Sequence, residues 1–228
     1  MIPLFDRIPV RRFSVVTYGL IAANFAVWFW ELGQRGNRIE HYAFYPCAVS
    51  GPCIGGARDH IAWPEGVLSS MFMHASWLHI LGNMLFLWIF GNNVEDVMGR
   101  FRFLVFYVAG GFAAALAQTW VTLHYAGAAA ASIPNVGASG AIAAVLGAYL
   151  VLLPRARIVT LVFGFLPLPI SAFIVLGVWF GLQLLQANFS LTHPDAGGGV
   201  AFAAHVGGFL FGVLAVRLFQ VRAPLRAR

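Results

Sequence analysis

The sequence contains no lysine and has few charged residues of any kind. Of its 228 residues, 10% are charged and 60% are hydrophobic. A water-soluble domain usually carries about 25% charged residues. This deficit indicates that most of the molecular surface faces lipid, and it excludes an ordinary soluble globular protein.

Acidic residues are scarcer than basic ones, so the formal net charge is +6, with 14 arginines against 8 aspartates and glutamates. Such an excess can indicate nucleic-acid binding, but these arginines are spread over the short connections between apolar runs. That distribution is typical of membrane topology and not of a nucleic-acid-binding stripe. We therefore expect the lipid bilayer as a partner and no nucleic acid.

The sequence has only two cysteines, Cys47 and Cys53, in one predicted connection. A disulfide and two unpaired thiols fit this pattern equally well. Two cysteines alone do not make a metal site, and the H-E-x-x-H pattern of zinc enzymes is absent. The apolar runs also lack the two aspartates that an aspartyl mechanism needs. We therefore expect no metal and no cofactor.

Six apolar runs are candidates for membrane-spanning helices, each of which needs about 20 mainly apolar residues. The fourth run is short, so its outer end is expected to begin below the lipid surface. Proline fits the first turn of a helix better than its interior, so we begin the fifth run near Ile170, with a kinked start near Leu161 as the alternative. The sequence thus predicts an all-α membrane protein with a single domain over 1–228 and helices at roughly 14–32, 72–91, 101–123, 139–153, 170–188 and 201–220.

The arginines also predict an orientation. If the N-terminus lies inside, 11 of the 14 arginines fall inside and only Arg35, Arg38 and Arg58 fall outside. An excess of positive charge marks the cytoplasmic side of a membrane protein. We therefore expect a multi-pass protein of the inner or plasma membrane of a cell, with both termini in the cytoplasm.

A serine, Ser139, stands close between Gly137 and Gly140, where a loop becomes the fourth apolar run. A hydroxyl at this position is either a helix cap or a nucleophile. Small residues also dominate the sixth run, where Gly208 and Gly212 are spaced for close helix packing. This pattern predicts that the fourth and sixth helices touch.

Three polar residues are expected at about the same depth in the membrane as Ser139. His205 is the ionisable residue in the outer part of the sixth run, and His79 and Asn83 lie on one face of the second. At about 1.5 Å of rise per residue, all four fall within roughly 10–15 Å of one another in depth. An ionisable group inside a membrane is a functional hypothesis, although one isolated histidine can also be an ordinary packing residue.

These residue types are suited to acyl transfer. A serine becomes a nucleophile when a neighbouring base takes its proton, and His205 is the candidate base for Ser139. His79, the Asn83 amide and the Ser139 backbone N–H are candidate donors to the oxyanion. Aspartate and glutamate are absent from the inner parts of the six runs, so the sequence predicts a Ser–His pair and not a triad.

The same residues resemble the rhomboid family of intramembrane serine proteases, and a further segment, 91–103, is similar to its bacterial branch. The resemblance implies a six-helix bundle around a water-filled cavity open to the outside, with Ser139 as nucleophile, His205 as general base, and His79 and Asn83 as oxyanion donors. It implies single-span membrane proteins as substrates and no cofactor. The motifs that carry it are Gly137 to Gly140, Ala204 to Gly208 with Gly212, and His74, His79 and Asn83.

One position departs from the family pattern, and two alternatives to a protease remain. Many relatives carry an aromatic residue four positions after the serine, but this chain has Ala143. The space beside the base is then empty, filled by water, or filled by another side chain such as Phe202. The alternatives are an inactive rhomboid-like binder of membrane helices and a small transporter. A glycine-rich segment, 194–199, is expected to cap the cavity.

Overall fold

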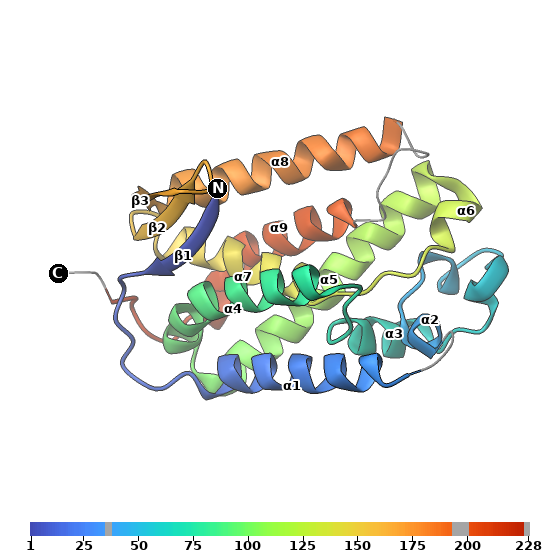
Figure 1. Ribbon diagram of the computed structural model, residues 1–228, viewed down its shortest axis with the longest axis horizontal. Coiled ribbons are helices and arrows are strands. Elements are labelled where there is room, and N and C mark those ends of the chain that lie inside the picture. Colours follow the sequence, from blue (N-terminus) through green and yellow to red (C-terminus); the bar gives the residue numbers. More distant parts are fainter. Residues whose placement is uncertain (35–37, 193–200, 226–228) are drawn as a thin grey trace.

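The computed structural model describes residues 1–34, 38–192 and 201–225 (Figure 1). Long helices run roughly side by side, and shorter helices gather at one end. The long helices are α1 (Val15–Leu32), α4 (Trp77–Met98), α5 (Arg100–Tyr125), α7 (Ser139–Leu152), α8 (Ala172–Thr192) and α9 (Phe202–Phe219). The short ones are α2 (Arg38–Tyr42), η1 (Pro46–Ala48), η2 (Gly55–Arg58), α3 (Trp63–Ser70) and α6 (Gly127–Ala131). The cap predicted at 194–199 lies outside the described residues.

Each predicted apolar run overlaps one long helix, although α4 extends seven residues beyond its run, and four of the six helices qualify as candidate membrane spans. Helices α1, α5, α8 and α9 are long and apolar enough to cross a membrane. Helix α7 has only 14 residues, and the 22-residue α4 is made less apolar by residues such as His79 and Asn83. The structure therefore supports a mostly helical membrane protein with four candidate spans among the described residues.

Helix α7 is the centre of the bundle. Every residue from Ala141 to Tyr149 is buried, and α4, α5, α8 and α9 surround this helix. The contact between α7 and α9 is the closest of these, because a Cβ on Gly212 would run into the carbonyl oxygen of Ala144 and one on Gly208 into that of Gly140. The predicted contact between the fourth and sixth helices is confirmed.

The prediction of an all-α protein is wrong for two segments, because 157–171 forms a β-hairpin and 2–6 adds a third strand to it. Strands β2 (Arg157–Val162) and β3 (Leu166–Ser171) pair antiparallel, with Ile158 opposite Ile170. The N-terminal strand β1 (Ile2–Asp6) pairs antiparallel with β2, which gives the order β1-β2-β3.

The hairpin has a local cause. The run Ile158–Val162 is rich in β-branched residues, which favour strands, and the prolines of the last strand lie at an edge, where a missing N–H is tolerated. The alternative of a kinked helix from Leu161 is therefore wrong, while the preferred start near Ile170 is two residues from the observed start at Ala172.

Strand β1 is tied to the central helix through Asp6. The Tyr149 hydroxyl donates to Asp6 Oδ2 at 2.6 Å, and Asn93 Nδ2 donates to the same oxygen at 2.7 Å. Burial raises the pKa of the Asp6 carboxyl, and the hydrogen bond from Tyr149 opposes this shift. The sheet is thereby anchored to the C-terminal parts of α4 and α7.

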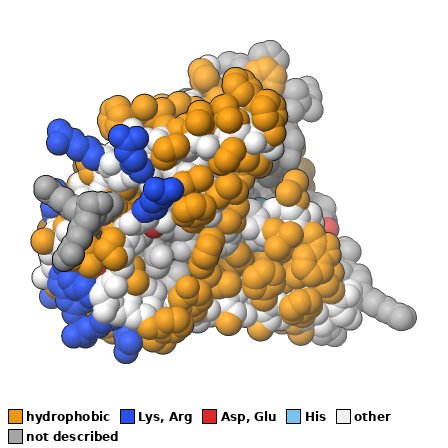
Figure 2. Space-filling model, turned by 60° about the vertical axis from the view of Figure 1, so that its left-hand side comes forward, with side chains coloured by type: hydrophobic (Ala, Val, Ile, Leu, Met, Phe, Trp, Pro, Cys, Tyr) orange, Lys and Arg blue, Asp and Glu red, His pale blue; other side chains and the backbone are white. Residues whose placement is uncertain are grey.

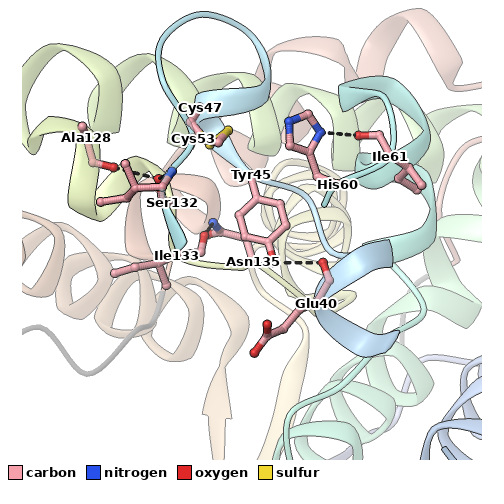
Figure 3. The surroundings of a disulfide bond; sticks show 11 residues. Glu40, Tyr45, Cys47, Cys53, His60, Ile61, Ala128, Ser132, Ile133 and Asn135 are labelled. Atoms are coloured by element: carbon pink, nitrogen blue, oxygen red, sulfur yellow. Dashed lines mark hydrogen bonds between the residues drawn. A yellow bond between two sulfur atoms is a disulfide. The ribbon is translucent and has the colours of Figure 1, made fainter. Parts of the chain in front are cut away.

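The long first connection folds against the loop that leads into α7 (Figure 3). Cys47 and Cys53 form a disulfide, which settles the alternative left open by the sequence. The Tyr45 hydroxyl donates to the Glu40 carbonyl oxygen at 2.9 Å, and burial, reinforced by the Glu40 charge, raises the pKa of Tyr45 to about 12. The disulfide loop is thus held in a packed environment.

Backbone hydrogen bonds connect the first connection to the loop before α7. Phe44 and Asn135 exchange two of them, at 3.2 and 2.9 Å, and Gly137 N–H donates to the Ser70 carbonyl oxygen at 2.8 Å. The first connection therefore determines where Gly137, two residues before Ser139, lies.

Arginine side chains gather on one side of the molecule (Figure 2). The segments that carry them, the start of α5, the turn before β2 and the end of α9, lie together there (Figure 1). Arg11 forms an ion pair with the buried Asp96 at 2.7 Å. The predicted charge asymmetry is thus confirmed for the described arginines.

We predict that Gly212→Ala destabilises the bundle by roughly 1–3 kcal/mol, because the added methyl must push α7 and α9 apart. Thermal unfolding in detergent measures the effect. Gly181→Ala in α8 is the matched control, since no atom lies within 4 Å of a Cβ built there. Equal melting temperatures for the two variants would contradict the tight α7–α9 contact.

Candidate active site

Ser139 is the first residue of α7, and its side chain does not cap that helix. The N-cap position belongs to Ala138, and no side chain makes a capping hydrogen bond there. The Ser139 hydroxyl lies 2.8 Å from Nε2 of His205, in the first turns of α9. Of the two roles that the sequence left open, the structure rejects that of a helix cap.

His205 is engaged through both ring nitrogens. Its Nδ1 lies 2.6 Å from Oε1 of Gln183, a buried residue of α8. An amide oxygen can only accept a hydrogen bond, so Nδ1 carries the proton and Nε2 presents its lone pair to Ser139. The arrangement is therefore a chain of three side chains from three helices, Gln183–His205–Ser139.

The space beside the His205 imidazole is filled by aromatic side chains. The Trp179 ring of α8 lies 5.9 Å from the imidazole of His205 at an interplanar angle of 37°. The Phe202 ring approaches it edge-on at 6.3 Å. Ala143, where many relatives carry an aromatic residue, is completely buried. The aromatic contact to the base thus comes from α8 and from the start of α9.

His79 lies beside the serine because Gly137 leaves room for it. Gly137 has a φ of +128°, and a Cβ at this position would come within 2.8 Å of His79 Nε2 and 3.6 Å of Ser139 Oγ. A side chain there would therefore displace the imidazole. Gly137, His79 and Ser139 thus surround one small space.

Asn83 belongs to a neighbouring group of polar residues. Its Nδ2 lies 3.0 Å from Nε2 of His74, whose ring is 5.1 Å from that of His79. The backbone N–H of His74 donates to the buried carboxylate of Glu31 at 3.2 and 3.3 Å. The structure therefore brings Ser139, His205 and His79 together, and it ties Asn83 to His74 beside them.

Three residues around the site were missed from the sequence. Gln183 and Trp179 contact the base, and Glu31 lies behind His74 at the end of α1. An amide inside an apolar run is a signal of helix–helix hydrogen bonding, and Gln183 could have been found by it. Glu31 also qualifies the expectation that no carboxylate lies near the site, although it meets the site only through His74.

A cavity of about 40 Å³ opens next to the serine. It is lined by small groups around Ser139, among them Gly137, Gly140 and Ala204. A cavity of this size holds a few waters or a small substituent. Among the described residues, no group of three or more histidine, cysteine, aspartate or glutamate side chains could hold a metal ion.

Comparison with known proteins gives a consistent family. A family model described as the Rhomboid domain matches residues 62–221. The chain is 29% identical over 219 residues to mitochondrial Rhomboid protein 1 of Saccharomyces cerevisiae, a match that covers 92% of this chain and 56% of that protein.

Two further relatives extend the comparison. The human mitochondrial presenilin-associated rhomboid-like protein is 29% identical over 204 residues, covering 86% of this chain and 46% of the relative. Rhomboid protease GluP of Bacillus subtilis is 30% identical over 165 residues, covering 70% of this chain and 28% of the relative. The chain thus spans about half the length, or less, of these relatives.

These relatives correct one prediction. The expectation of the inner or plasma membrane of a cell, with both termini in the cytoplasm, is wrong on this comparison, because relatives that match 86% to 92% of the chain are named as mitochondrial proteins. The arginine distribution identifies which end of the bundle is positive, but it does not identify the membrane.

We predict that Ala143→Tyr lowers the stability by roughly 1–3 kcal/mol, because a ring must enter a site that is already packed. The melting temperature should fall, and a fluorophosphonate should label Ser139 no faster than in the parent. Ala129→Tyr, at an exposed position of α6, is the control. A stable variant that labels faster would mean that the space beside His205 is open.

Proposed function

Since this chain belongs to the rhomboid family, we propose that it is an intramembrane serine endopeptidase that cuts membrane-protein substrates with a Ser139–His205 dyad. The observation that carries this proposal is the 2.8 Å approach of Ser139 Oγ to His205 Nε2, with the opposite ring nitrogen already engaged by Gln183. This is the geometry in which an imidazole can accept the serine proton.

In the proposed reaction, Ser139 Oγ attacks the scissile carbonyl carbon while His205 Nε2 takes the hydroxyl proton. The tetrahedral intermediate collapses to an acyl-enzyme, and His205 returns the proton to the leaving amine. A water molecule, activated by the same imidazole, then hydrolyses the ester. Each step uses only proton transfers that His205 can make in place.

We place the oxyanion next to His79. Its ring lies over Gly137, next to Ser139, and the Ser139 backbone N–H at the free N-terminus of α7 is a further donor. Asn83 has two amide hydrogens, and its contact with His74 uses one of them. In this proposal the second stabilises the oxyanion together with His79.

The proposed substrates are single-span membrane proteins, which reach the site from the lipid. The small cavity beside Ser139 would accept a short side chain of such a segment. We propose that residues 1–228 act as one rhomboid-type domain, with α4 and α7 completing six spans, in a mitochondrial membrane, for which the yeast and human relatives are named. The disulfide lies at the end opposite the arginines, which suits an oxidising compartment on that side.

We predict that Ser139→Ala and His205→Ala each lower cleavage of a transmembrane substrate in liposomes by roughly 10³-fold or more. The double variant should be no worse than either single variant, because the two side chains act as one unit. Ser50→Ala and His124→Ala, at exposed positions, are the controls. Cleavage retained by purified Ser139→Ala would reject the dyad. Absence of cleavage and labelling by the parent would favour the inactive helix binder.

A further inference from the structure

The first inference concerns how the base is held. Trp179 and Gln183 are four residues apart on α8, so they lie on one face of that helix. Both are directed at His205: the tryptophan ring packs at 5.9 Å, and the Gln183 oxygen accepts from Nδ1 at 2.6 Å. One turn of α8 therefore supplies both an aromatic surface and an acceptor to the imidazole.

We propose that Gln183 is a positioning residue that keeps His205 in the Nδ1–H tautomer, so that Nε2 is always the nitrogen free to accept from Ser139. This inference rests on the proposed function. Without an acceptor at Nδ1, a neutral imidazole distributes its proton over both nitrogens, and the form protonated on Nε2 cannot act as the base. Being neutral, the Gln183 amide sets the tautomer without adding a buried charge.

The surroundings of His205 leave this task to Gln183. His79 of α4 is the titratable neighbour of the imidazole, and Ser139 of α7 and Trp179 of α8 do not titrate near neutral pH. No described carboxylate contacts either ring nitrogen, because each is engaged by an uncharged partner. The orientation of the base therefore depends on an amide from a neighbouring helix.

Because Gln183 and Trp179 both belong to α8, the contacts of His205 depend on the position of that helix. Much of α8 is exposed, including Phe173, Leu182 and Leu185, whereas α7 is buried on all sides. A shift of α8 away from α9 would remove the acceptor and the aromatic surface from His205 together. The base is thus ready for catalysis only while α8 is docked.

Two measurements on the full chain test this inference. The first is the rate of fluorophosphonate labelling of Ser139, and the second is the ¹⁵N spectrum of histidine-labelled protein, with the His205 signals assigned through His205→Gln. Gln183→Met keeps the side-chain length and removes the acceptor, whereas Gln183→Glu keeps an acceptor. Gln186→Met, at an exposed position of the same helix, is the matched control.

We expect Gln183→Met to label about tenfold more slowly and to show His205 as a mixture of tautomers. Gln183→Glu should keep the Nδ1–H form and most of the labelling rate, which a purely space-filling role would not explain. If Gln183→Met labels like Gln186→Met and keeps the Nδ1–H signal, the positioning role is rejected. If the parent itself does not label, the proposed function fails, and the ¹⁵N spectra still decide the tautomer.

A second inference starts from the β-hairpin, whose tip presents large apolar side chains to the surroundings. Phe163 and Phe165 are 83% and 76% exposed, and Leu166 and Leu168 next to them are also exposed. Phe163 adopts a φ of +54° at the turn, a conformation that favours glycine or asparagine. An aromatic residue at a strained and exposed position contributes nothing to the packing of this chain.

The arginine-rich base of the hairpin and the first turns of α8 indicate what covers this tip. Arg155 and Arg157 are exposed where β2 begins. Helix α8 starts directly after β3, and its exposed Phe173 and Ile174 continue the apolar surface. The hairpin lies alongside the first turns of α8 (Figure 1), so its tip adjoins the lipid-facing surface of a membrane span.

We infer that the hairpin tip inserts into the lipid leaflet at the arginine-rich end, with Arg155 and Arg157 at the level of the headgroup phosphates. Aromatic side chains bury favourably at this depth, and arginines bind anionic headgroups. The hairpin would then be a second membrane attachment, beside the spans themselves, that holds β1 and the start of α8 at the interface.

The depth of the tip can be measured with a nitroxide on Phe165→Cys in vesicles of phosphatidylcholine with and without phosphatidylglycerol. Both native cysteines are in the disulfide, so the label is specific. Leu185→Cys on the exposed face of α8 is the lipid reference, and Arg12→Cys is the water reference. The readout is collision with oxygen compared with a water-soluble nickel complex.

We expect the label at 165 to resemble that at Leu185, with less contact to nickel when phosphatidylglycerol is present. A label that collides with nickel as often as the one at Arg12 would overturn the inference. A label shielded from both reagents would also overturn it, because another protein surface would then cover the tip. The Phe163→Ser variant should shift the label at 165 toward water, and no shift would reject the role of the aromatic pair.

Discussion

The close approach of α7 and α9 is the contact on which the rest of the structure depends. Two helices that meet backbone to backbone through Gly208 and Gly212 have little freedom to slide or rotate. The serine lies at the start of one helix and the histidine in the first turns of the other, so this packing brings the two residues together, and the hydroxyl lies 2.8 Å from the imidazole. Bulkier residues at Gly208 and Gly212 would push α7 and α9 apart, and with them Ser139 and His205.

Around that seam, the remaining segments each supply one constraint. The first connection binds the loop before α7 through Phe44, Asn135 and Ser70, and Gly137 leaves the space that His79 occupies. Helix α8 contacts the far side of His205 through Gln183 and Trp179. The site is therefore assembled from segments far apart in the chain, as is expected where polar side chains must be satisfied away from water.

Much of the fold and the site was accessible from the sequence. The six apolar runs overlap the six long helices, since the length and apolarity of a helix are local properties. The arginine asymmetry and the glycine seam were read in the same way, and so were Ser139, His205 and His79. Asn83 was placed at the right depth, yet its amide is engaged by His74. The hairpin at 157–171 was missed because short apolar runs have no periodicity that separates strand from helix.

What the sequence determined by itself is the class of protein: a helical membrane protein with a serine and a histidine at matching depth, close-packing glycines and the motifs of one family. Those features follow from composition, spacing and local pattern. Only the tertiary structure decided how the base is held, because Trp179 and Gln183 reach His205 across a helix interface that no local pattern encodes. It also decided that Glu31 contacts His74 and that β1 pairs with the hairpin, since contacts between distant segments depend on the packing of the whole bundle.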